Sequence, residues 1–164
     1  MSVNFEELYN KMLFVLKKDP VAVDVLNDMS DLLVNWRNAQ PVNPKPLELV
    51  EQVLGLQGSA LKRLTEHQDF KKADRVKKSI YKTLKFSAPY NFDHYMQAIE
   101  FDRPAEERFY IPRRKVLLQA VQNMQRLADG ELDELFLSMP PRCGKTSLCT
   151  FFYTWILGRD SELS

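Results

Sequence analysis

Apolar residues recur every three to four positions along most of the chain, which is the spacing that places them on one face of an α-helix. Prolines and turn-forming residues interrupt the pattern, as at Asp19-Pro20 and in the proline-rich run 40–46. The first two helices are expected to pack as an antiparallel pair, because only a short turn joins them. The predicted helices in the first part of the chain cover residues 4–18, 21–38, 46–64 and 70–86.

The third of these helices contains Gly55 and Gly58. A glycine in a helix interior costs about 1 kcal/mol relative to alanine. The alternatives are a continuous helix that tolerates both glycines and a helix that breaks at them.

The pattern changes at residues 87–91, where a run of basic residues stops, turn formers appear and aromatic residues become denser. We place a domain boundary here, between a helical module of residues 1–86 and a second domain of residues 87–164. In the second domain a helix is predicted over 113–128, ended by Asp129-Gly130, and the apolar run 134–138 is typical of a buried parallel strand. A last helix is predicted from the spacing of Leu148, Phe151, Phe152, Trp155 and Ile156, with Gly158 as its stop.

The turn between this strand and the last helix carries the best candidate for chemistry. It matches the phosphate-binding pattern GxxxxGK[S/T] at Gly144, Lys145 and Thr146, but Met139 stands where the first glycine is expected. In such a loop, backbone N–H groups of residues 143–145 surround phosphates, Lys145 reaches the outer phosphates and the Thr146 hydroxyl holds Mg²⁺. The alternative is Gly-Lys-Thr at the start of an ordinary helix.

The run Ser138-Met-Pro-Pro-Arg-Cys-Gly-Lys-Thr146 resembles the divergent Walker A motif of tailed-bacteriophage terminase large subunits, the ATP-driven motors that package viral DNA into procapsids. In that family Pro-Pro-Arg often precedes x-Gly-Lys-[Ser/Thr], and the first glycine is often absent. The run 107–117 is similar to the segment that precedes the motif there, and the run 155–160 fits the end of the family's helix. The resemblance extends from about Ser87 to the end of the chain.

This resemblance implies a mainly α chain: an N-terminal helical module, followed by the opening strand-loop-helix of a P-loop NTPase α/β domain. We expect that domain to be truncated, without a Walker B strand or the family's nuclease domain, so that the chain alone would not turn over ATP. The implied ligands are ATP and Mg²⁺. The implied nucleotide-binding residues are Pro141, Arg142, Cys143, Gly144, Lys145, Thr146 and Ser147, with Tyr110, Arg113 and Arg114 on the adenine side.

The resemblance also implies roles and partners. Lys145 and Arg142 would be the catalytic residues, with Arg142 either stabilising transition-state charge in cis or holding the loop in shape. Partners would be double-stranded viral DNA, the small terminase subunit, the portal protein and further copies of the chain. The location would be the host cytoplasm during phage assembly, without a membrane.

Charge and composition narrow these expectations. The net charge is +1, which gives no global attraction to nucleic acid. One local cluster is basic, and it is either a solvated helix face or a contact for DNA phosphates. No signal peptide or membrane span is visible, which favours an intracellular protein. The spacing of Cys143 and Cys149, and that of His67 and His94, matches neither a metal site nor a redox pair. The basic cluster comprises Lys71, Lys72, Arg75, Lys77, Lys78, Lys82 and Lys85 against the single acid Asp74.

Two other functions stay open on the sequence. One is another P-loop DNA-dependent ATPase, such as a helicase-like or transposition protein. The other is a non-enzymatic module in which residues 1–86 serve docking or oligomerisation and the P-loop is inactive.

Overall fold

The computed structural model describes residues 4–162, with side chains as far as Arg159. The described residues are mainly helical, which confirms the predicted class, and none of them is in a strand. The chain divides into two compact units, residues 1–86 and 87–164, at the position where the sequence pattern changes. Between residues 4 and 162 there is no helix with the length and apolar character needed to cross a membrane.

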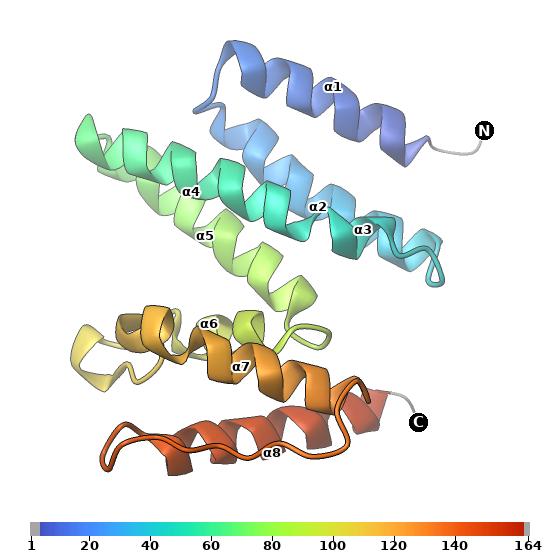
Figure 1. The fold of residues 1–164 in the computed structure, drawn as a ribbon. Coiled ribbons are helices and arrows are strands. Elements are labelled where there is room, and N and C mark those ends of the chain that lie inside the picture. Colours follow the sequence, from blue (N-terminus) through green and yellow to red (C-terminus); the bar gives the residue numbers. More distant parts are fainter. Residues whose placement is uncertain (1–3, 163–164) are drawn as a thin grey trace. The chain divides into compact units, whose positions relative to one another are not determined.

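The first unit is a set of helices that pack side by side (Figure 1). Helices α1 and α2 run in opposite directions and are in contact, as predicted. The helix expected from Pro46 is divided at Leu49, and its longer part continues through Gly55 and Gly58, so the glycines do not break it. The helices are α1 (Phe5–Lys18), α2 (Val23–Ala39), α3 (Lys45–Glu48), α4 (Val50–Glu66) and α5 (Phe70–Ser87).

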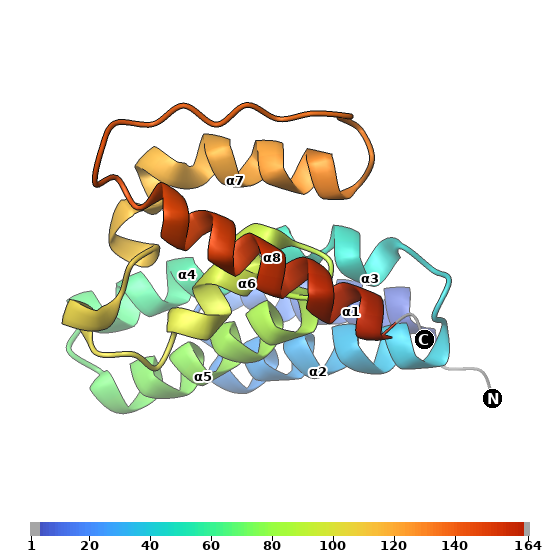
Figure 2. The ribbon, with the colours of Figure 1, turned by 90° about the horizontal axis from the view of Figure 1, so that it is seen from below.

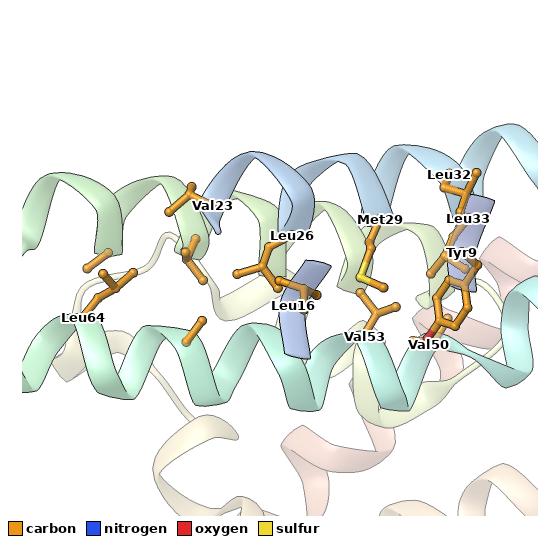
Figure 3. Packing of buried hydrophobic residues seen from close by; sticks show 13 residues of the cluster. Tyr9, Leu16, Val23, Leu26, Met29, Leu32, Leu33, Val50, Val53 and Leu64 are labelled. Atoms are coloured by element: carbon orange, nitrogen blue, oxygen red, sulfur yellow. The ribbon is translucent and has the colours of Figure 1, made fainter. Parts of the chain in front are cut away.

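The core of the first unit forms where the apolar faces of these helices meet (Figure 3). Met29 of α2 lies against Val53 of α4, Leu26 of α2 belongs to the same cluster, and all three side chains are fully buried. Burial of a large apolar side chain contributes about 1.5–3 kcal/mol to stability, so this core is what holds the helices of the unit together.

A polar cluster lies inside this core and connects α2, α4 and α5. The Gln57 side-chain nitrogen lies within hydrogen-bond distance of the Leu26 carbonyl (3.2 Å) and of the hydroxyls of Ser30 and Ser79 (2.9 Å each), and its two N–H groups are shared among these acceptors. The Ser30 hydroxyl is also 2.8 Å from the Thr83 hydroxyl. Since buried polar groups are costly without partners, these bonds favour one alignment of the three helices.

The second unit contains a helix that the periodicity did not predict, α6 (Phe92–Glu100), whose first turn is capped by the Asn91 side chain. Two short 3-10 helices follow, η1 (Ala105–Glu107) and η2 (Ile111–Arg113), and η2 continues into α7 (Arg114–Ala128). The chain then returns beside α7 as an extended segment and enters α8 (Lys145–Glu162), as Figure 2 shows. Phe92 packs edge-on against Phe152 of α8 (ring centroids 5.3 Å apart) and so joins α6 to α8.

The predicted strand 134–138 is extended but has no ladder partner among the described residues. Its side chains nevertheless alternate: Leu135, Leu137 and Met139 pack on the core of the unit, whereas Phe136 is 89% exposed. This alternation is the period of a β-strand. Because a strand also requires inter-strand hydrogen bonds, the parallel strand stays a prediction.

The predicted helix stop at Gly158 was wrong, since α8 continues through it to Glu162. Gly130, by contrast, has a φ of 74° just after α7 and ends that helix as predicted. A glycine typically ends a helix by adopting the left-handed conformation, and Gly158 is not left-handed. It is an exposed interior glycine that weakens the helix without ending it.

Candidate functional site

The loop before α8 has a specific backbone geometry. The Cys143 N–H donates to the Pro140 carbonyl (3.3 Å) and closes a turn. Arg142 and Gly144 both have positive φ, 63° and 84°. Glycine adopts this conformation freely, whereas a non-glycine residue there costs about 1–3 kcal/mol and needs support from its surroundings. The loop therefore holds a strained shape at Arg142.

Gly144 is required at its position for a second reason, which is close contact with an aromatic ring. A Cβ atom built on Gly144 would lie 2.1 Å from Cε2 and 2.6 Å from Cζ of Phe109. The Phe109 ring also stacks on Phe151 of α8 (centroids 6.2 Å apart), and the Arg113 guanidinium lies 5.4 Å from its centroid. One ring thus contacts the loop, α8 and the segment before α7.

The loop places the start of α8 at the edge of a hollow. Lys145 begins the helix, and the first bond of the helix runs from the Leu148 N–H to the Gly144 carbonyl (2.9 Å). The N–H groups of residues 145–147 consequently have no partner within the helix, and they form the positive end of its dipole. The hollow has a volume of about 370 Å³ and is lined by Met139, Pro140, Pro141, Arg142, Gly144, Lys145 and Thr146.

Most of the residues predicted for phosphate binding therefore lie together. Arg142, Lys145 and Thr146 are exposed and line this hollow. Cys143 is half-buried, and its N–H is already engaged in the turn, so it differs from the expected phosphate donor. Ser147 is exposed in the first turn of α8 but does not line the hollow.

The three residues predicted for the adenine side have other contacts. The Tyr110 side chain is fully buried, and its hydroxyl donates to Asp93. Arg114 donates to the same carboxylate through two bonds of 2.8 and 2.7 Å. Arg113 lies on Phe109, as described above, and its side chain donates to the Phe109 carbonyl (3.2 Å). None of the three lines the hollow, so their contact with adenine stays a prediction.

Asp93 is the electrostatic centre of this group. Burial alone would raise the pKa of Asp93, but the hydrogen bonds from Arg114 and Tyr110, together with the Arg114 charge, hold that pKa below its usual range. Burial and the bond to Asp93 raise the pKa of Tyr110. The charged carboxylate and the neutral phenol are therefore the stable forms near neutral pH.

Glu100 is a structural residue that the sequence did not reveal. Its side chain is fully buried at the end of α6 and accepts three backbone N–H groups. Oε1 accepts from Phe109 (2.9 Å) and Tyr110 (2.8 Å), and Oε2 from Tyr110 and Ile111 (2.9 Å each). An acidic residue in an aromatic-rich stretch is only a weak sequence signal of a buried carboxylate, because exposed glutamates occur in similar stretches.

The basic cluster on α5 is partly neutralised by acids. Arg75 pairs with Asp24 and Lys82 with Asp31, both acids belonging to α2. Two further pairs form close to or within α5, Lys72 with Asp69 (3.2 Å) and Lys78 with Asp74 (3.0 Å). These contacts favour the solvated-face interpretation over a contact with DNA phosphates.

No group of three or more His, Cys, Asp or Glu side chains that could hold a metal ion occurs in the described part of the chain. Cys143 and Cys149 are free thiols. Comparisons of the chain with protein-family models, curated proteins and solved structures find no match.

Proposed function

We propose that the loop of residues 139–147 binds the phosphates of ATP, and that the chain belongs to a DNA-packaging ATPase of the terminase large-subunit kind. The observation that carries the proposal is the hollow at the start of α8, where Gly144 turns the backbone and Lys145 lies beside free helix N–H groups. A helix N-terminus attracts anions through these groups and the helix dipole. The motif resemblance, from Ser138 to Thr146, supplies the identity of the anion.

Each lining residue has a distinct task in this proposal. The Lys145 ammonium neutralises charge on the outer phosphates, and the N–H groups of the first turn of α8 donate to phosphate oxygens. Arg142 adds a second positive charge at the same hollow, for phosphate binding or for transition-state charge. Arg142 has a left-handed backbone, and its exposed side chain is part of the lining of the hollow.

The Thr146 hydroxyl is the group that would hold Mg²⁺. Mg²⁺ keeps several waters and is commonly bound through substrate phosphates with few protein oxygens. One exposed hydroxyl beside the phosphate hollow fits that requirement, whereas the described residues offer no acidic cluster that would hold the ion alone. When bound with ATP, Mg²⁺ would neutralise charge on the phosphates.

The partners follow from the proposal as a whole. They are viral DNA, the small terminase subunit, the portal protein and further copies of the chain, in the host cytoplasm. The ion pairs of Arg75 and Lys82 with acids of α2 reduce the positive charge that α5 could offer to DNA phosphates.

A direct test is to measure the equilibrium binding of Mg-ATP to the 164-residue chain by titration calorimetry. We expect Lys145→Ala to weaken binding at least about tenfold, because charge-assisted bonds to phosphate contribute about 1.5–3 kcal/mol. Lys115→Ala is the matched control, since Lys115 is an exposed lysine of α7 outside the hollow. Equal binding by both variants, or no binding by the unaltered chain, would favour the non-enzymatic helical module.

A further inference from the structure

We infer that Phe109 is a positioning residue that holds the phosphate loop in its binding conformation, an inference that rests on the proposed nucleotide binding. The ring occupies the space beside Gly144 that any larger residue would fill. It does not line the hollow itself. Its effect on phosphate binding therefore passes through the backbone of the loop.

The ring is placed between the loop and the helix that the loop starts. On the loop it contacts Gly144, and on α8 it stacks on Phe151, six residues after the first helical residue, Lys145. The angle at which the loop enters α8 decides where the N–H groups of residues 145–147 are directed. A ring packed against both parts restricts that angle.

Both backbone polar groups of Phe109, the N–H and the carbonyl, are hydrogen-bonded, so the position from which the ring projects is fixed. Its N–H donates to the buried Glu100 carboxylate (2.9 Å), and its carbonyl accepts from Arg113 (3.2 Å). The next two N–H groups, of Tyr110 and Ile111, donate to the same carboxylate. Glu100 consequently fixes the segment from which the ring projects.

The loop needs such support, because Arg142 has a left-handed backbone conformation that a non-glycine residue adopts only at a cost. Arg142 is strained at a φ of 63° and would relax if the packing around the loop were removed. Without the ring, the loop samples shapes in which its N–H groups no longer converge on one phosphate group. Affinity for phosphate then falls, whether or not a base is attached to it.

The test compares two ligands, Mg-ATP and inorganic tripolyphosphate with Mg²⁺, on the full chain. We expect Phe109→Ala to lower the affinity for both ligands by the same factor, about tenfold. This factor is in the range found for residues that are coupled through direct contact. Phe109→Leu, which retains part of the packing volume, should give a smaller loss for both ligands. Phe136→Ala is the control, since it removes an exposed ring of the same unit (89% exposed) and should leave both affinities unchanged.

A double-mutant cycle with Gly144 examines the contact itself. Gly144→Ala should reduce both affinities, because its Cβ collides with the ring and its φ is unfavourable for alanine. Adding Phe109→Ala should cost less in the Gly144→Ala chain than in the unaltered one, since the collision is then absent.

The outcomes separate this inference from the proposed function. Loss of ATP affinity alone in Phe109→Ala, with tripolyphosphate unaffected, would mean that the ring contacts the base, and the inference would be wrong. Unchanged binding of both ligands, or strict additivity in the cycle, would also overturn it while leaving the phosphate site intact. If the unaltered chain binds neither ligand, the proposed function fails and the inference fails with it.

Discussion

Replacing Glu100 with glutamine changes the buried carboxylate of the second unit into an amide. The side chain keeps its size, but one acceptor oxygen becomes an NH₂ group. Three backbone N–H groups converge on the two oxygens, so at least one of them would then face a donor. A hydrogen bond to a charged group contributes about 1.5–3 kcal/mol, and its loss leaves a buried donor unsatisfied. We expect Glu100→Gln to lower the free energy of unfolding of this unit by about 2–4 kcal/mol.

The chain offers a clean measurement, because each unit contains one tryptophan, Trp36 in the first and Trp155 in the second. Both are buried. In a Trp36→Phe background, urea unfolding followed by fluorescence reports the second unit through Trp155, whose indole N–H donates to the Ala88 carbonyl (2.8 Å). The slope of the unfolding free energy against urea shows whether the variant changes stability or compactness.

Glu106→Gln is the matched control, because Glu106 is exposed in η1 and the same chemical change there should stay within about 0.5 kcal/mol. The reasoning about Glu100 would be refuted if Glu100→Gln also stayed within about 0.5 kcal/mol at an unchanged urea slope. That result would mean that the three N–H groups find other acceptors, and that the segment 109–111 does not depend on the carboxylate.

Two further predictions concern pH and glycine. Because the folded-state pKa of Asp93 is depressed, its contribution to stability is present above the unfolded pKa of about 3.9 and is lost as the pH falls through the folded value. Acid titration followed by Trp155 should therefore show a stability loss below about pH 4 that is reduced in Asp93→Asn, and equal acid sensitivity of the two chains would contradict this assignment. Gly58→Ala should stabilise the first unit by about 0.5–1 kcal/mol, since Gly58 is exposed in α4 and, apart from the adjacent backbone of that helix, no heavy atom lies within 4 Å of the added Cβ. Urea unfolding followed by Trp36 checks this, and a loss of stability would show that α4 needs the flexibility of glycine.

The positions of most helices could be predicted from the sequence, because amphipathic periodicity is a local property. Helices α1, α2, α5 and α7 begin and end within two residues of the predicted bounds. The end of α7 just before Gly130 followed from local chemistry as well, since glycine enters the left-handed region most readily. Helix α6 was missed, although Asn91 as its cap was a local signal that could have found it.

The phosphate-loop candidate was likewise a sequence finding, because Gly144, Lys145 and Thr146 are adjacent in the chain and their spacing is the signal. Its identification with ATP stays a proposal. The expected strand before it shows why adjacency is not enough: the alternation of Leu135, Phe136 and Leu137 is local, whereas the hydrogen bonds that define a strand need a partner elsewhere.

The tertiary structure alone decided what surrounds the loop. Phe109 is 35 positions before Gly144 in the sequence, and no periodicity places its ring where a Cβ of residue 144 would be. Nor does any pattern distinguish the buried Glu100 from an exposed glutamate, because burial depends on which other segments pack over it. The continuation of α8 through Gly158 was also decided by tertiary structure. An interior glycine has only a small local cost, which packing of the rest of the helix outweighs. Local spacing therefore determined the helices and the candidate loop, whereas contacts between distant segments determined the residues that hold the loop in place.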